Sequence, residues 1–272
     1  MCRWAAYRGD PLFLEELVSS PAHSLIEQSH CATRAKTATN GDGFGIAWYG
    51  DRPEPGRYRD ILPAWSDCNL KSMARQIRSP LFLAHVRAST GGGTRRDNCH
   101  PFVWGNWSFM HNGQIADFER LRRPMEGMLD DELFNVRSGT TDSELLFLLA
   151  LQFGLCQTPL AAMAETMSFV EGLAEHITGA PLLRFTAAFS DGKSLYAIRY
   201  ATDGKAPTLY AAPLGGGQGY CLVSEPLNDD IDSWAEIPNG SAVTVTAGGV
   251  DVAVFQPEKR GVAKVAALAI PA

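Results

Sequence analysis

Long hydrophobic runs are missing from this 272-residue sequence. No stretch of eighteen or more apolar residues occurs, so we expect no membrane-spanning helix. The first ten residues, MCRWAAYRGD, contain two arginines and an aspartate and lack the apolar core of a secretion signal. The sequence therefore predicts a cytoplasmic protein with no membrane partner.

Cysteine is sparse and scattered, with no C-x-x-C pair. The six cysteines are Cys2, Cys31, Cys68, Cys99, Cys156 and Cys221. Disulfide frameworks are dense in much shorter chains, so we expect free thiols here. Zinc sites need clustered ligands at short spacing, and for the adjacent pair Cys99–His100 we favour packing instead. The sequence predicts neither a metal nor another cofactor.

Positive charge is in the minority, with 24 Lys and Arg against 30 Asp and Glu and a formal net charge of −6. Nucleic-acid-binding proteins usually carry a basic face, so this balance indicates no nucleic-acid partner. Internal repeats, low-complexity stretches and a convincing linker are also missing. We therefore predict a single domain over residues 1–272.

Short strands are expected near both ends of the chain and helices in its middle. The predicted strands are residues 2–7, 46–49, 81–86, 107–110, 184–189, 195–200, 209–212, 221–224, 242–246 and 250–255. The predicted helices are residues 12–18, 24–29, 69–78, 121–137, 141–153 and 158–176, and Thr141 with Glu144 forms a capping-box pattern. Residues 51–56 are charged and rich in proline, which indicates a surface loop. This order favours an α+β fold over repeated βαβ units.

Cys2 carries the first chemical indication. A small second residue permits removal of Met1, which leaves a cysteine with a free α-amine. An α-amine has an unperturbed pKa of about 7.7–8.0, so it can accept the thiol proton near neutral pH without a histidine. This is one way to activate a weak nucleophile. Considered alone, a cysteine that simply lies in a strand is an equally good interpretation.

The motif HVRAST, residues 85–90, follows a predicted buried strand. An arginine at such a strand end, here Arg87, can bind a carboxylate through two parallel hydrogen bonds. Ser89 and Thr90 add hydroxyl groups nearby. The structural alternative is an arginine held in an internal salt bridge.

Two further motifs suit an amide substrate. His111-Asn112-Gly113 ends the next predicted strand, where the Asn112 amide and the Gly113 backbone N–H can form an oxyanion hole. Asp142 lies in the segment TTDSE, which opens a helix, and its carboxylate can meet an ammonium group. Each has a structural alternative, since Asn-Gly is a common hairpin turn and the helix dipole favours acids in the first turn.

Cys2, HVRAST, HNG and TTDSE, in this order, resemble the glutaminase domain of class II glutamine amidotransferases. The segments NGDGFGIAWY, residues 40–49, and SEPL, residues 224–227, resemble the stand-alone bacterial branch of that family, which includes the γ-glutamyl hydrolase of ergothioneine synthesis. The resemblance covers most of the chain and is densest over residues 2–150. It implies the N-terminal-nucleophile (Ntn) hydrolase fold, a four-layer αββα sandwich of two antiparallel sheets covered by helices.

The resemblance also implies roles for individual residues. Cys2 would be the nucleophile, and glutamine or a γ-glutamyl compound would be cleaved through a γ-glutamyl thioester with release of ammonia or an amine. The remaining residues would be Arg87 and Thr90 for the substrate carboxylate end, Asn112 and Gly113 for the oxyanion, and Asp142 for the ammonium.

The sequence departs from the large amidotransferases in two places. It ends at Ala272 without a synthase domain that consumes ammonia, so either an acceptor subunit is separate or the protein is a plain hydrolase. The loop TGGGTRRDN, residues 90–98, also differs, which leaves the substrate open. Two alternatives remain: a base supplied by His85, His100 or His111, and a catalytically idle glutamine-binding subunit or sensor.

Overall fold

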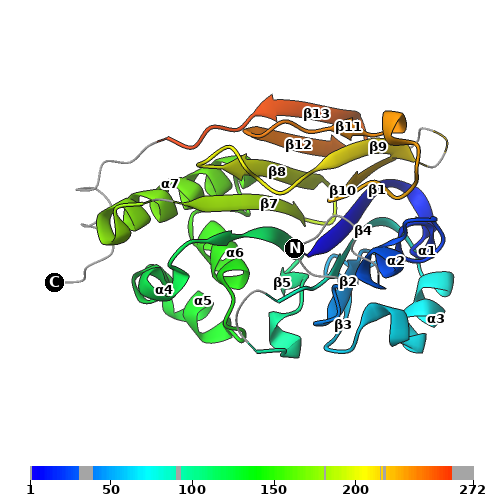
Figure 1. Cartoon of the computed structure of the whole chain (residues 1–272), viewed down its shortest axis with the longest axis horizontal. Helices are drawn as coiled ribbons and strands as arrows, with labels where there is room; N and C mark the ends of the chain where they lie inside the picture. The colour runs from blue at the N-terminus through cyan, green and yellow to red at the C-terminus, as the bar shows by residue number, and fades with distance from the viewer. Residues whose placement is uncertain are drawn as a thin grey trace.

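Two antiparallel sheets lie face to face in the computed structural model (Figure 1), which describes residues 2–30, 39–89, 93–180, 182–214, 216 and 219–258. Across this described part, the first sheet has the strand order β11-β9-β10-β1-β4-β2-β3 and the second has the order β13-β12-β8-β7-β6-β5. The strands of the first sheet are β1 (Arg3–Phe13), β2 (Phe44–Trp48), β3 (Gly56–Asp60), β4 (Arg78–Val86), β9 (Tyr210–Leu214), β10 (Gly219–Val223) and β11 (Ala235–Glu236). Those of the second are β5 (Phe102–Trp104), β6 (Trp107–Ile115), β7 (Leu183–Ser190), β8 (Leu195–Ala201), β12 (Ser241–Thr246) and β13 (Gly249–Val254).

Helices cover the outer face of each sheet (Figure 1). Apolar side chains of α1 (Glu15–Val18), α2 (Leu25–His30) and α3 (Cys68–Gln76) pack on the first sheet. Those of α4 (Phe118–Glu126), α6 (Asp142–Gln152) and α7 (Pro159–Thr178) pack on the second, while α5 (Asp131–Val136) lies between α4 and α6 in the chain. The expected four-layer αββα arrangement is therefore confirmed.

The space between the sheets is filled by a separate apolar cluster. On β1, Trp4 and Ala6 point into this cluster, while Ala5 and Tyr7 point to the helices on the other side. Successive side chains of a strand point to opposite faces of its sheet. A strand that packs against helices on one face and against the other sheet on the second must therefore be apolar on both faces. This explains why the segment that begins at Cys2 carries so few polar residues.

Several predicted boundaries are wrong, and the difference at β6 bears on the site. The strand does not end at Met110: it runs through Asn112 and Gly113, which pair with Thr186 and Phe185 of β7. The Asn-Gly pair is therefore no hairpin turn, because the partner strand β7 continues its ladder past it. The hairpin lies earlier, where residues 105–106 join β5 to β6.

The other differences lie away from this strand. Residues 12–13 belong to β1 instead of the first helix, and the predicted helix 121–137 is divided into α4 and α5. β3, β5 and β11 were not predicted, and they are short strands at or beside the edges of the sheets. In the part of the chain that the structure describes, no helix is both long and apolar enough to cross a membrane.

Candidate active site

Cys2 immediately precedes β1, which runs between β4 and β10 in the first sheet. Its half-buried thiol donates to the backbone oxygen of Ala88 at 3.4 Å and accepts from the backbone N–H of Ala88 at 3.3 Å. Burial raises the pKa of the thiol, while the hydrogen bond from Ala88 and the charges of Arg87 and Arg3 oppose this effect. A thiol in this position needs a base to become a nucleophile.

The carbonyl oxygen of Cys2 accepts two side-chain hydrogen bonds. The amide nitrogen Nδ2 of Asn112 donates at 2.8 Å and the guanidinium of Arg3 donates at 3.1 Å. Asn112 comes from β6 in the second sheet, and its side chain is buried. The side chain of Asn112 is also hydrogen-bonded with the ring of His85, so it connects the first residue of the site to a buried histidine.

Arg87 follows β4 and is held against the turn at residues 42–43. Its backbone N–H donates to Gly43 at 2.8 Å, and its backbone oxygen accepts from Asp42 at 3.0 Å. The guanidinium donates to the Asp42 backbone oxygen at 3.4 Å and to Ser89 Oγ at 3.1 Å.

The Arg87 side chain nevertheless has no counter-ion in the described part of the chain. The residue is only 4% exposed, and none of the ion pairs found among the described residues includes it. The predicted alternative of an internally salt-bridged arginine is therefore wrong for this part of the chain. A buried cation with only neutral partners favours the binding of an anion.

The N-terminus of α6 is fixed to the end of β6. The N-cap Thr141 accepts from the backbone of Glu144 at 3.3 Å, which confirms the predicted cap. Asp142, the first residue of the helix, accepts from the backbone N–H of Ile115 at 3.1 Å, and Ser143 Oγ lies 2.9 Å from Nδ1 of His111. Asp142 therefore contacts the strand two residues beyond Gly113.

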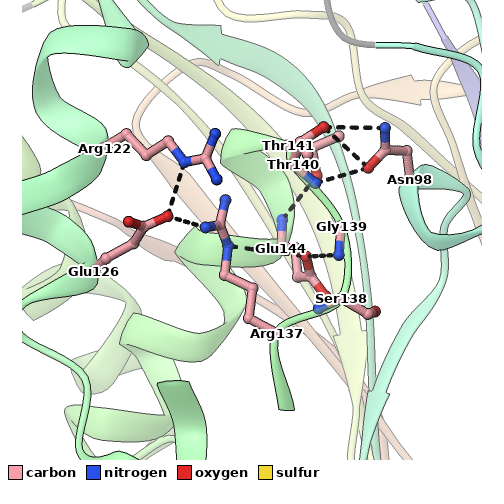
Figure 2. Close-up of polar contacts among 9 residues, drawn as sticks. All are labelled: Asn98, Arg122, Glu126, Arg137, Ser138, Gly139, Thr140, Thr141 and Glu144. Carbon is pink, nitrogen blue, oxygen red and sulfur yellow. Dashed lines mark hydrogen bonds and ion pairs between the residues drawn. The ribbon is translucent and has the colours of Figure 1, made fainter. Parts of the chain in front are cut away.

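The loop before α6 is held by Glu144 and by Asn98, and the sequence analysis did not single out Asn98 (Figure 2). The carboxylate of Glu144 accepts from the backbone N–H groups of Ser138 and Gly139 at 3.0 and 2.7 Å. Asn98 accepts from the backbone of Thr140 at 2.8 Å and donates to the backbone oxygen of Gly93 at 3.1 Å. Together these contacts connect the chain that follows Arg87 to the start of α6.

A group of ion-paired side chains lies beside the carboxylate of Glu144 (Figure 2). Arg137 pairs with Glu126 and lies 4.0 Å from Glu144, and Arg122 pairs with Glu126 at 2.8 Å. The capping-box pattern is the one sequence signal for this arrangement, since it marks Glu144 as a residue that reaches back over the helix start.

Three buried histidines, His85, His100 and His111, are not hydrogen-bonded to the thiol. The Cys2 Sγ is hydrogen-bonded to the Ala88 backbone, and no hydrogen bond from His85, His100 or His111 to it occurs among the described residues. The rings of His85 and His100 have centroids 4.2 Å apart. Burial lowers the pKa of His85 to about 3, and it lowers the pKa values of His100 and His111 as well. All three rings are therefore neutral at pH 7.

The structure thus brings together Cys2, Arg87, Asn112, Gly113 and Asp142, which lie at the ends of β1 and β4, within β6 and at the start of α6. Thr90 lies outside the described residues. Among the residues that are described, no group of three or more His, Cys, Asp or Glu side chains could hold a metal ion.

Known proteins match most of this chain. The family model for class-II glutamine amidotransferases matches residues 18–211. The Saccharomyces cerevisiae protein named "Probable glutamine amidotransferase DUG3" is 32% identical over 90% of this chain and 82% of its own length. The gamma-glutamyl-hercynylcysteine sulfoxide hydrolase of Mycolicibacterium smegmatis is 30% identical over 90% of this chain and 96% of its own. A solved glutamine aminotransferase class-II domain protein from Silicibacter pomeroyi has a TM-score of 0.75 and 41% identity over 94% of this chain and 100% of its own.

We predict that Gly113→Ala destabilises the protein severely. Gly113 has φ +150°, and an added Cβ would lie 1.9 Å from the Arg184 carbonyl oxygen and 2.5 Å from Nε2 of His111. We expect the free energy of unfolding, measured by chemical denaturation, to fall by about 3 kcal/mol or more, because the backbone at Arg184 must move to make room. Gly105→Ala is the matched control: Gly105 has φ +53° with open space around it, so its loss should be about 1 kcal/mol. Equal losses would contradict the steric argument.

We also predict that acid weakens the fold through His85. Its folded pKa of about 3 lies below the unfolded value of about 6.5, so the unfolded chain binds more protons between these values. The stabilisation is complete above about pH 6.5 and is lost as the pH falls. Going from pH 7 to pH 5 should cost about 2 kcal/mol through this one residue. Denaturation of His85→Gln at both pH values should show a smaller difference than wild type, and an unchanged difference would count against the prediction.

Proposed function

Since this chain belongs to the class II glutamine amidotransferases, a family of enzymes, we propose that it hydrolyses the side-chain amide of glutamine or of a γ-glutamyl amide through a thioester on Cys2. The observation that carries the proposal is the convergence of three groups on one place. Asn112 donates to the carbonyl oxygen of Cys2, and the Cys2 thiol is hydrogen-bonded to the backbone of Ala88. Arg87, the residue before Ala88, acts on the thiol through its charge and has no counter-ion among the described residues.

Substrate binding is assigned to groups that do not react. The α-carboxylate of the substrate supplies the anion that the buried Arg87 guanidinium lacks, and the α-ammonium pairs with Asp142. Asp142 keeps its place because the backbone of Ile115 and the hydroxyl of Ser143 donate to its two oxygens.

The assignment of Thr90 to substrate binding stays a prediction, and so do the single domain and the cytoplasmic location.

The reaction begins with transfer of the thiol proton to the α-amine of Cys2 in the chain that has lost Met1. The neutral histidines are poor alternatives, since none of them is hydrogen-bonded to the thiol. The thiolate attacks the side-chain carbonyl, and the oxyanion accepts from Asn112 and the Gly113 N–H. The α-ammonium then protonates the leaving nitrogen. Water attacks the resulting thioester, releases glutamate and restores the thiol.

The leaving group is proposed to be an organic amine as well as ammonia. The relative from Mycolicibacterium smegmatis is named as a hydrolase of a γ-glutamyl compound, and it is matched over nearly its whole length. A hydrolase of this kind needs no synthase domain to consume ammonia. A separate acceptor subunit would be needed only if ammonia from glutamine were transferred to another substrate.

The proposed base predicts that activity requires an exposed Cys2. Insertion of a bulky residue between Met1 and Cys2 should prevent removal of Met1, so that the nitrogen of Cys2 stays in an amide bond. Turnover of a γ-glutamyl amide should then fall at least about a hundredfold, because an amide nitrogen cannot accept the thiol proton. Glutamate release is measured on preparations whose N-terminus is checked by intact mass. Normal turnover by the extended protein would overturn the α-amine as base, and no turnover by the processed protein on any γ-glutamyl amide would favour an idle relative.

The proposed roles of Arg87 and Asn112 predict different kinetic defects. Arg87→Lys keeps the charge but not the two-pronged geometry, so KM should rise about tenfold or more with kcat nearly unchanged. Asn112→Ala removes a donor to charge that develops only in the transition state, so kcat should fall about a hundredfold. Steady-state kinetics on both folded variants decides the matter. The reverse pattern, with KM alone changed in Asn112→Ala, would show that the roles are wrong.

A further inference from the structure

The SEPL segment, residues 224–227, follows β10 and lies against the first residues of β1, although the two are more than 200 residues apart in the chain (Figure 1). The backbone N–H of Ser224 donates to the Trp4 oxygen at 3.0 Å, and Ser224 Oγ accepts from the Trp4 N–H at 2.9 Å. Ser224 therefore extends the β1–β10 ladder by one residue toward Cys2. The proposed chemistry assigns no role to this motif.

Glu225, the next residue, reaches the side chain beside the nucleophile. Its carboxylate pairs with the guanidinium of Arg3 at 2.5 Å, and the two side chains are 16% and 3% exposed. The same guanidinium donates to the carbonyl oxygen of Cys2 at 3.1 Å. Since a buried guanidinium is costly unless a carboxylate neutralises it, Glu225 keeps Arg3 in this place.

We propose that Glu225 and Arg3 form a positioning ion pair for the nucleophile, in which Glu225 acts through Arg3 to orient Cys2 and to set the charge around its thiol and amine. The inference rests on the proposed function in that processed Cys2 is the reacting residue. Neither side chain is assigned a contact with the substrate, so both are positioning residues and not catalytic ones.

The geometry fixes the sign of the electrostatic effect. The nitrogen and carbonyl oxygen of one residue are separated by two atoms, so the Arg3 guanidinium lies within roughly 7 Å of the Cys2 nitrogen. At this range a positive charge lowers the pKa of both the α-ammonium and the thiol, and the charge of Glu225 offsets part of that effect. Among the described residues, the charge of Arg87 also acts on the Cys2 thiol. Asp42, His85 and His111 are hydrogen-bonded to Ser89, Asn112 and Ser143 of the same site.

The test is the pH dependence of Cys2 alkylation by iodoacetamide, followed by the mass of the N-terminal peptide in protein shown by intact mass to lack Met1. Glu225→Gln should move the midpoint of the alkylation profile about half a unit to one unit lower, because Arg3 is no longer neutralised. Arg3→Met should move the midpoint higher by a similar amount, and Arg3→Lys should leave it near the wild-type value.

A matched control is Glu236→Gln, which breaks the 2.7 Å ion pair of Arg199 and Glu236 at another site. It should leave the midpoint unchanged. A Glu225→Gln midpoint that stays in place, rises, or moves no more than that of Glu236→Gln would overturn the proposal. Glu225 is partly exposed, so its variant gives an answer even if Arg3→Met fails to fold.

Turnover separates this proposal from the proposed function. With a γ-glutamyl anilide as substrate, Arg3→Met should lower kcat about tenfold with KM nearly unchanged, since Arg3 orients Cys2 and touches no substrate. Wild-type protein without any turnover would overturn the function, while the alkylation midpoints would still decide the role of the ion pair. If wild-type protein were active but the alkylation midpoints of the variants equalled its own, only the proposed role of the ion pair would be overturned.

Discussion

The hydrogen bond from Asn112 to the carbonyl oxygen of Cys2 connects the two sheets at the proposed nucleophile. Cys2 leads into β1 of the first sheet, whereas Asn112 lies within β6 of the second, and the apolar layer between the sheets sets their separation. A shift of one sheet against the other would break this 2.8 Å contact. The thiol, the proposed oxyanion donor and the start of α6 are therefore aligned by the packing of the whole sandwich.

The electrostatics of the site follow from where charge is buried. Two guanidinium groups, those of Arg3 and Arg87, lie close to Cys2, and Glu225 neutralises only Arg3. The neighbouring histidines contribute no charge, because burial holds their pKa values low. In the proposed function, Arg87 binds the carboxylate end of a glutamyl group, while Asp142, which contacts the end of β6, binds its ammonium.

Local patterns in the sequence predicted part of this arrangement well. The cap at Thr141, the buried strand before Arg87 and the strands after residue 183 other than β11 were recognised, because each depends on neighbouring residues. The Asn112–Gly113 pair was misread in its secondary structure, since only the partner strand β7 shows that the ladder continues through it. The four-layer order itself came from the family resemblance, not from the pattern of apolar residues.

Contacts between distant parts of the chain could not be predicted. Asn98 meets Thr140, and Glu225 meets Arg3 across most of the sequence, so nothing local marks either pair. The sequence also could not show that Arg87 has no counter-ion among the described residues, because this depends on every carboxylate that the fold brings near. The motifs identified the candidate residues, but only their placement shows which of them can act together.

The central claim is that Cys2 carries the glutamyl group during turnover. The most direct measurement is acid quenching of the processed enzyme while it hydrolyses a γ-glutamyl amide, followed by intact and peptide mass. We predict a fraction of protein heavier by one glutamyl residue, with the adduct on the N-terminal peptide and lost on treatment with hydroxylamine. Steady turnover without any such adduct on Cys2, or with the adduct on another cysteine, would contradict the account.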